Sequence, residues 1–155
     1  MISDKESRWP EGTIFRIDPA HIRRKFYEQA VSIGIQTYVE VVSVSGNIIT
    51  SIITSDSLKR IGLKCGMFIT AEVKAPWIHL CKNSSAPNCS AENMFQGTVS
   101  RIAKNSTTAE IVILLPDGTE LCAIITEKSR LHMDIRPKDT LWAFFDAFAV
   151  ILHVD

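Results

Sequence analysis

Residues 50–80, TSIITSDSLKRIGLKCGMFITAEVKAPWIHL, decide the fold, because the same pattern returns in residues 122–152, CAIITEKSRLHMDIRPKDTLWAFFDAFAVIL. The triplet Ile-Ile-Thr recurs at a constant offset, and Ser57 matches Ser129 at the same offset. The offset of about seventy residues is longer than the period of solenoid repeats. The pattern therefore predicts two small domains in tandem.

The composition agrees with two lobes of modest size. The chain has 155 residues, of which 46% are hydrophobic, so each lobe alone would have a marginal core, and oligomerisation is expected to add buried surface. We predict a first lobe over 1–81, a linker over 82–92 and a second lobe over 93–155.

Each lobe carries five short β-rich segments separated by turn residues. This order predicts an all-β fold of two OB-like Greek-key β-barrel lobes. The expected strands are 12–17, 38–44, 48–54, 67–74 and 77–80 in the first lobe, and 97–102, 109–115, 121–126, 141–146 and 150–154 in the second.

A helical insertion is predicted over residues 18–34 of the first lobe. Asp18 suits the N-cap, Pro19 suits the first helical position, apolar residues recur every four positions from Ile22, and Gly34 suits the end. The second lobe has no counterpart of this segment.

Several function classes find no support in the sequence. The opening residues do not form a secretory signal, and no apolar run is long enough to cross a bilayer. Four cysteines without C-x-x-C spacing indicate a reduced cytoplasmic protein, although a zinc pair or disulfide between Cys81 and Cys89 is an alternative to free thiols. The histidines are scattered, so we do not expect an enzyme.

One compact group of hydrogen-bond donors remains. Lys74 supplies a positive charge, and Thr54 and Ser57 supply hydroxyls three residues apart. A tetrahedral oxyanion needs ammonium, O–H and N–H groups around it. The alternative is a capped turn near a strand-end lysine, which is common in β-proteins.

Four motifs resemble the mop, or TOBE, domains that bind molybdate in bacteria, and in particular their tandem di-mop form. They are IITSDSLKRIGLKCGM at 52–67, VKAPWIHL at 73–80, SAENMFQGTV at 90–99 and PDGTELCAIIT at 116–126. The resemblance covers nearly the whole chain apart from residues 18–34. It implies an intracellular homo-oligomer, a dimer or trimer, that holds molybdate or tungstate at subunit interfaces.

The resemblance also implies which residues hold the oxyanion. Carried over onto this sequence, they are Ser7, Arg8, Thr54, Ser57, Lys74 and Ala75. The segment around Arg8 departs from the family's Ser-x-Arg-Asn pattern, because the serine is adjacent to the arginine and the asparagine is missing.

The second lobe matches the pattern less well. Its weaker candidates are Ser90, Asn93, Thr126 and Ser129. Glu92 stands where the family has arginine and Asp146 where it has lysine, and at an effective dielectric near ~20 each close charge contact is worth roughly a few kcal/mol before desolvation. We therefore expect the second lobe not to hold a dianion by itself.

The leading hypothesis is a protein that stores, buffers or senses molybdate without changing it chemically. The alternative is a regulatory or protein-interaction module without its own DNA-binding part, with Arg23, Arg24 and Lys25 as the contact surface. Single-stranded nucleic-acid binding is a third hypothesis from the barrel fold alone, but seventeen basic residues balance seventeen acidic ones, so direct nucleic-acid binding is not expected.

Overall fold

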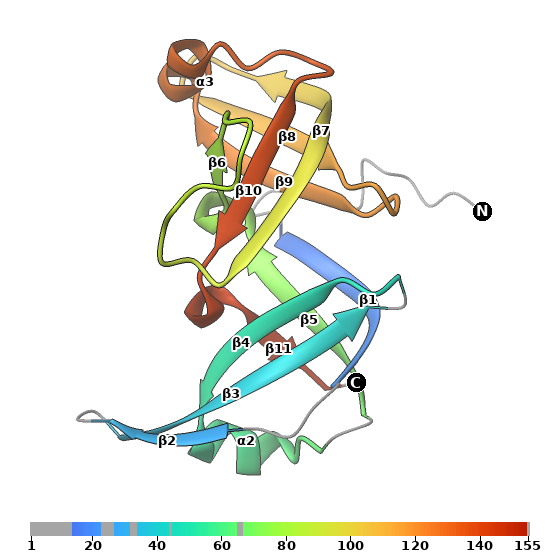
Figure 1. The fold of residues 1–155 in the computed structure, drawn as a ribbon, viewed down its shortest axis with the longest axis vertical. Coiled ribbons are helices and arrows are strands. Elements are labelled where there is room, and N and C mark those ends of the chain that lie inside the picture. Colours follow the sequence, from blue (N-terminus) through green and yellow to red (C-terminus); the bar gives the residue numbers. More distant parts are fainter. Residues whose placement is uncertain (1–13, 23–26, 32–33, 44, 65–66, 155) are drawn as a thin grey trace. The chain divides into compact units, whose positions relative to one another are not determined.

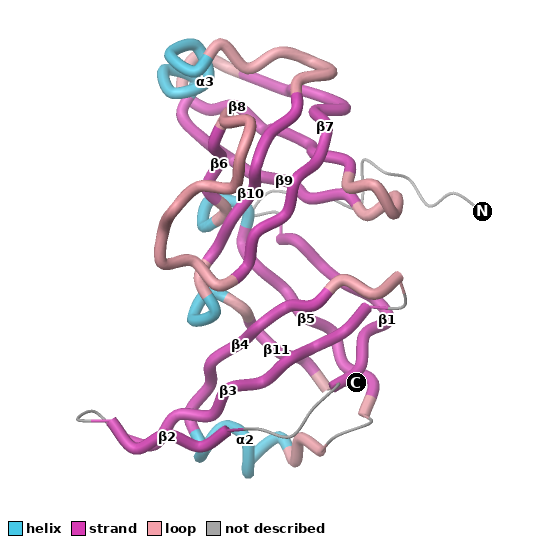
Figure 2. Tube along the Cα trace, in the orientation of Figure 1, coloured by secondary structure: helices cyan, strands magenta, loops and turns pink. Residues whose placement is uncertain are grey.

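The structure is a computed structural model that describes residues 14–22, 27–31, 34–43, 45–64 and 67–154. Strands dominate the described residues, with two short α-helices and two 3-10 turns between them (Figure 2). The first elements are β1 (Ile14–Ile22), β2 (Tyr27–Val31), β3 (Gly34–Ser43), β4 (Ile48–Thr54), α2 (Ser55–Ile61), β5 (Phe68–Lys74), η1 (Ala75–Trp77) and β6 (His79–Cys81). They are followed by β7 (Asn93–Lys104), β8 (Thr108–Leu114), β9 (Glu120–Thr126), α3 (Glu127–Met133), β10 (Thr140–Phe145), η2 (Ala147–Ala149) and β11 (Ile151–His153). The predicted all-β fold is confirmed.

The chain forms two compact units, and each unit contains a piece of both sequence repeats. Unit 1 consists of residues 1–15 and 74–145, and unit 2 of residues 16–73 and 146–155. The predicted division at 81 and 93 differs from this arrangement: residues 74–81 belong with the strands of the second repeat, and residues 146–155 with those of the first. The two repeats have exchanged their C-terminal arms, each a 3-10 turn followed by a short strand.

Unit 2 is built on a sheet with the strand order β11-β5-β1-β3-β2, and β4 also pairs with β3 (Figure 1). The predicted β3–β4 hairpin is present, and Gly46 in its turn takes a φ of 94°, which glycine adopts without the steric penalty of a side chain. Buried residues of these strands form the core, with Val39, Ile49 and Ile69 at most 2% exposed. The exchanged arm is tied to this sheet, because Ser51 Oγ donates to the Val150 carbonyl over 3.2 Å.

The helix predicted over residues 18–34 is wrong. The described residues of this segment lie in β1 and β2, and β2 pairs antiparallel with β3 from Tyr27 opposite Tyr38 to Val31 opposite Gly34. The cap signals at Asp18 and Pro19 are local, whereas pairing with β3 supplies a ladder of backbone hydrogen bonds that outweighs them. The short helix of the first repeat is α2. The basic cluster at residues 23–25 lies outside the described residues.

Unit 1 contains a five-stranded antiparallel sheet in the order β6-β10-β7-β8-β9. The exchanged arm supplies β6, whose His79, Leu80 and Cys81 pair with β10. Large side chains fill the core, including Ile111, Leu141 and Phe145, which are fully buried. No helix in the described part of either unit is long and apolar enough to cross a membrane.

Gly97 lets β7 approach β8 closely at the core of unit 1. A Cβ atom at this position would overlap the Ile113 side chain and lie 2.8 Å from the Leu114 carbonyl oxygen. The glycine of the SAENMFQGTV motif is therefore required by packing, since any side chain there would push the two strands apart.

We expect Gly97→Ala to lower the free energy of unfolding by about 1–3 kcal/mol, the usual cost of overpacking a core. Gln96→Ala, at the exposed neighbouring position, is the control and should change stability little. Thermal and urea unfolding followed by circular dichroism measure both. Equal stability of the two variants would contradict the packing argument.

Candidate functional site

The first candidate element is the turn between β4 and α2. Thr54 has extended backbone angles (φ −73°, ψ 150°) and caps the helix, because its Oγ1 accepts the Ser57 amide N–H over 3.1 Å. The Thr54 hydroxyl in turn donates to Ser57 Oγ over 2.9 Å. Gly62 ends the helix in the left-handed conformation, with φ 66°. The two hydroxyls predicted from sequence are therefore adjacent and held in one orientation.

The turn between β9 and α3 repeats this geometry. Thr126 Oγ1 accepts the Ser129 amide over 3.0 Å, and its hydroxyl donates to Ser129 Oγ over 2.8 Å. Asp134 ends α3 with φ 50°, at the position where the first repeat has Gly62. The two sequence repeats therefore hold their threonine and serine hydroxyls in the same geometry.

The charges around the two turns differ. Arg60 Nη2 lies 3.4 Å from Ser57 Oγ, at long hydrogen-bond distance. At the second turn, Arg130 is bound by Glu127 through both carboxylate oxygens, one at 2.8 Å from Nη2, and Lys104 lies 3.5 Å from the same carboxylate. Both turns have an acidic residue, Asp56 in the first and Glu127 in the second, but among the described residues only Glu127 is paired with a guanidinium.

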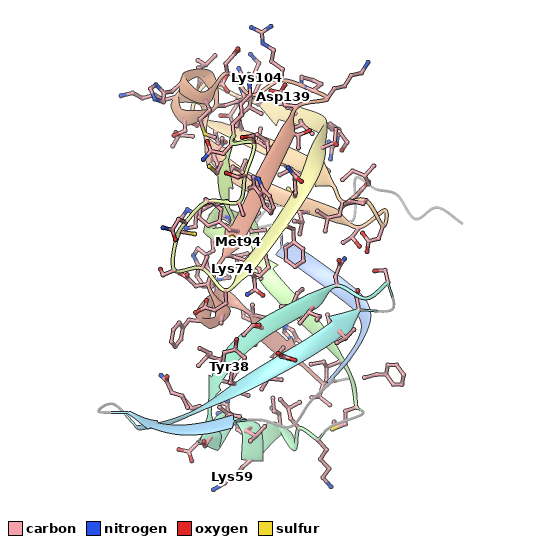
Figure 3. The ribbon with its side chains drawn as sticks, viewed as in Figure 1. Tyr38, Lys59, Lys74, Met94, Lys104 and Asp139 are labelled. Atoms are coloured by element: carbon pink, nitrogen blue, oxygen red, sulfur yellow. The ribbon has the colours of Figure 1, made fainter. Side chains whose placement is uncertain are left out.

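Glu127, Arg130 and Lys104 form a charged cluster, and their interactions shift the pKa values of Glu127 and Arg130. The hydrogen bond from Arg130 lowers the pKa of Glu127, and the same hydrogen bond raises the pKa of Arg130. Lys104, at the end of β7, also lowers the pKa of Glu127 (Figure 3). Glu127 therefore stays ionised to lower pH than an ordinary glutamate and keeps its negative charge next to Thr126.

Lys74 stands at the end of β5 with its ammonium group in solvent. Its Nζ lies 5.3 Å from the centroid of the Trp77 ring, a cation–π distance, and both side chains are exposed. Among the described residues no carboxylate forms an ion pair with it. The backbone then enters η1, where Ala75 is fully buried and packs in a cluster with Val112 and Cys122. Lys74 is therefore a cation held at a fixed point and available to an anion.

Asp146 occupies the matching point of the second arm. Its backbone angles (φ −74°, ψ 150°) resemble those of Lys74 (φ −67°, ψ 133°), and the fully buried Ala147 follows it into η2. Two equivalent backbone positions thus carry opposite charges, as the sequence comparison of the repeats indicated.

The exchange of arms changes which residues share a unit. Thr54 and Ser57 belong to unit 2, whereas Lys74 and Ala75 belong to unit 1. The structure therefore does not group the predicted set within one lobe. Instead, η1 with Lys74 contacts β9, which leads to the Thr126 turn, and η2 contacts β4, which leads to the Thr54 turn.

The remaining predicted residues lie elsewhere or are not described. Ser7 and Arg8 fall outside the described residues. Ser90 is exposed in the loop before β7, and Asn93 is the buried first residue of β7, 2% exposed.

Unit 1 also has an open pocket of about 490 Å³ beside the second turn. Thr108, Thr126 and Ser129 contribute hydroxyls, and the rest of the lining is mainly apolar. His79 lines it too and stacks on Phe144 of β10, with ring centroids 5.5 Å apart. The pocket presents neutral donors to a ligand.

The described residues contain no group of three or more histidine, cysteine or acidic side chains able to hold a metal ion. Cys81, Cys89 and Cys122 are free thiols, so no disulfide joins Cys81 to Cys89. Burial, with a smaller effect of Glu110, raises the pKa of the Cys122 thiol well above its usual range, so this thiol stays protonated and unreactive.

Comparisons with known proteins show similarity of sequence and fold. Residues 89–152 match the model of the TOBE domain. The solved structure of the cytoplasmic molybdate-binding protein ModG, in a form with molybdate bound, is 28% identical and superposes with a TM-score of 0.80, covering 92% of this chain and 96% of that one. The chain therefore carries a TOBE domain over residues 89–152, and it shares the fold of ModG over nearly its whole length. Its two repeats form the tandem version of that fold.

Two further proteins are similar to this chain. The transcriptional regulator ModE of Yersinia pestis is 30% identical over 120 residues, which are 76% of this chain and 45% of the regulator. A molybdate-binding protein from Sporomusa ovata is 36% identical, covering 39% of this chain and 90% of that one, with a TM-score of 0.37. The chain thus spans less than half the length of the curated regulators it matches.

Sequence reasoning missed Arg60. The signal was present, because Arg60 follows Ser57 by three residues, and side chains three apart on a helix lie on the same face. Only the structure shows that its guanidinium reaches the serine hydroxyl.

We expect Thr54→Ala and Thr126→Ala each to lower the free energy of unfolding by about 1 kcal/mol, because each removes an equivalent helix cap. Thr54→Ser and Thr126→Ser keep the capping oxygen and are the matched controls. Urea unfolding of the four variants measures this. A stability loss confined to one turn would show that the two caps are not equivalent.

Proposed function

We propose that this protein binds molybdate or tungstate as an intact oxyanion and does not change it chemically. The observation that carries the proposal is the hydrogen-bonded pair of hydroxyls at Thr54 and Ser57, together with Lys74, which has no ion-pair partner among the described residues, in a chain that carries a TOBE domain. The molybdate-binding protein ModG, which shares the fold over nearly the whole chain, supports the choice of anion. The role is storage, buffering or sensing in the cytoplasm.

The chemistry of the donors suits this ligand. A tetrahedral dianion accepts several hydrogen bonds and is bound most strongly where cations and hydroxyls converge without a nearby carboxylate. Ser57 can donate its hydroxyl proton, Thr54 holds Ser57 in place through two hydrogen bonds, and Lys74 is a cation without a carboxylate partner among the described residues. Ser7, Arg8 and the Ala75 backbone complete the proposed set by resemblance to the family.

The site is proposed to lie at subunit interfaces of a homo-oligomer, a dimer or trimer. The resemblance to the mop modules, in which the oxyanion sits between subunits, supports this location. Oxyanion binding and oligomerisation would then depend on each other.

The second turn is proposed to be a weaker site. Its candidates are Ser90, Asn93, Thr126 and Ser129, all neutral donors. Glu127 lies next to Thr126 and is bound to Arg130, so that guanidinium is not free for an anion. Glu92 and Asp146 take the places of cations in the family pattern and add negative charge.

A regulatory role is the second candidate. The observation that favours it is the match to ModE, a transcriptional regulator, over 76% of this chain. In that role oxyanion binding would alter contacts with a protein partner. Pull-down experiments from cell extract with and without molybdate would test it, and identical sets of captured proteins would argue for storage instead.

Isothermal titration of the full chain with molybdate and with tungstate tests the main proposal. We expect Lys74→Ala to weaken binding at least about tenfold, since it removes a close opposite charge. Lys59→Ala is the matched control, because Lys59 projects from α2 away from the strands and should leave the affinity unchanged (Figure 3). Native mass spectrometry of the same samples counts the anions per oligomer.

Wild-type protein that gives no heat and no thermal stabilisation with either anion would refute the proposal. Equal affinity of the Lys74→Ala and Lys59→Ala variants would remove Lys74 from the site while leaving the function in place.

A further inference from the structure

We propose that Arg60 is a positioning residue for the oxyanion, acting through the hydroxyl of Ser57. The inference rests on the proposed function and adds a residue that the family pattern did not assign. It follows from the hydrogen bonds of the first turn and from the contrast with the second.

The hydrogen bonds fix the direction of the Ser57 proton. The Thr54 oxygen accepts the Ser57 N–H, and the Thr54 hydroxyl donates its own proton to Ser57 Oγ. Arg60 Nη2 also points at Ser57 Oγ, over 3.4 Å. Ser57 Oγ thus faces two donors, and because a hydroxyl has one proton, that proton must point away from both. The Ser57 hydroxyl proton is therefore available to donate a hydrogen bond to a ligand.

The charge of Arg60 strengthens this donor. A guanidinium on the acceptor side of a hydroxyl polarises the O–H bond, and hydrogen bonds become stronger when they are chained in this way. Arg60 forms no ion pair with a carboxylate in the described part of the chain, although Asp56 lies in the first turn of the same helix. An anion at Ser57 would interact with a polarised hydroxyl and with the positive field behind it.

The second turn shows the same hydroxyl pair without this support. Ser129 Oγ accepts from Thr126, but the nearby guanidinium of Arg130 is held by Glu127. His132 occupies the position that corresponds to Arg60. Both turns carry an acidic residue, Asp56 in the first and Glu127 in the second. They differ in that Arg60 has no carboxylate partner among the described residues, whereas Arg130 is bound by Glu127.

The test is a double-mutant cycle on molybdate affinity in the full chain, measured by isothermal titration at low salt. The variants are Arg60→Gln, Ser57→Ala and the double variant, with Lys59→Gln as the control for loss of one exposed positive charge from α2. We expect Arg60→Gln to raise the Kd about tenfold, Lys59→Gln to change it less than about twofold because that charge is screened, and Arg60→Lys to recover part of the loss.

The cycle separates positioning from simple attraction. If Arg60 acts through Ser57, then Arg60→Gln has little further effect in the Ser57→Ala background. Full additivity of the two losses would overturn the positioning role, and so would an Arg60→Gln affinity equal to that of Lys59→Gln. Thermal unfolding of each variant checks that it is folded. If Arg60→Gln is destabilised, the affinity of Arg60→Lys, which keeps the positive charge, decides the test.

Failure of the inference and failure of the function give different results. A wild-type chain that binds molybdate while Arg60→Gln binds equally well refutes only the role of Arg60. A wild-type chain that binds neither anion refutes the proposed function, and the inference with it.

Discussion

Each compact unit depends on a buried alanine that the other repeat supplies. Ala75 and Ala147 are both fully buried, and each follows the last strand of its own repeat into a 3-10 turn that contacts the opposite repeat's strands. A larger side chain at either position would have to displace closely packed neighbours. Because neither repeat completes its core with its own residues, the two must fold together, and a chain cut between them would leave both cores open.

The exchange of arms also determines which compact unit carries Lys74 and which carries Asp146. The residue just before each buried alanine is charged and exposed, so packing of the alanine fixes where the charge stands. Lys74 and Asp146 thereby occupy equivalent backbone positions in different units. The two repeats differ in charge at these positions, while the capped turns at Thr54 and Thr126 share their geometry.

Much of this organisation was predictable from sequence because its signals are local. The capped turns follow from a threonine three residues before a serine, and Gly46 marks the β3–β4 hairpin. The helix predicted over residues 18–34 failed because its signals were equally local but weaker than pairing with β3. The candidate site was predictable in its residue types. Its arrangement was not, because arm exchange depends on which strands pack together and leaves no periodic trace in the sequence.

The sequence by itself determined the tandem repeat, the all-β fold, the two hydroxyl turns and the opposite charges at positions 74 and 146. These are properties of short segments and of residue identity. Only the tertiary structure decided that the arms are exchanged, that Arg60 approaches Ser57, and that Glu127 neutralises Arg130. Whether a guanidinium is free or paired depends on distances of a few ångströms between side chains, and those distances are set when the chain packs.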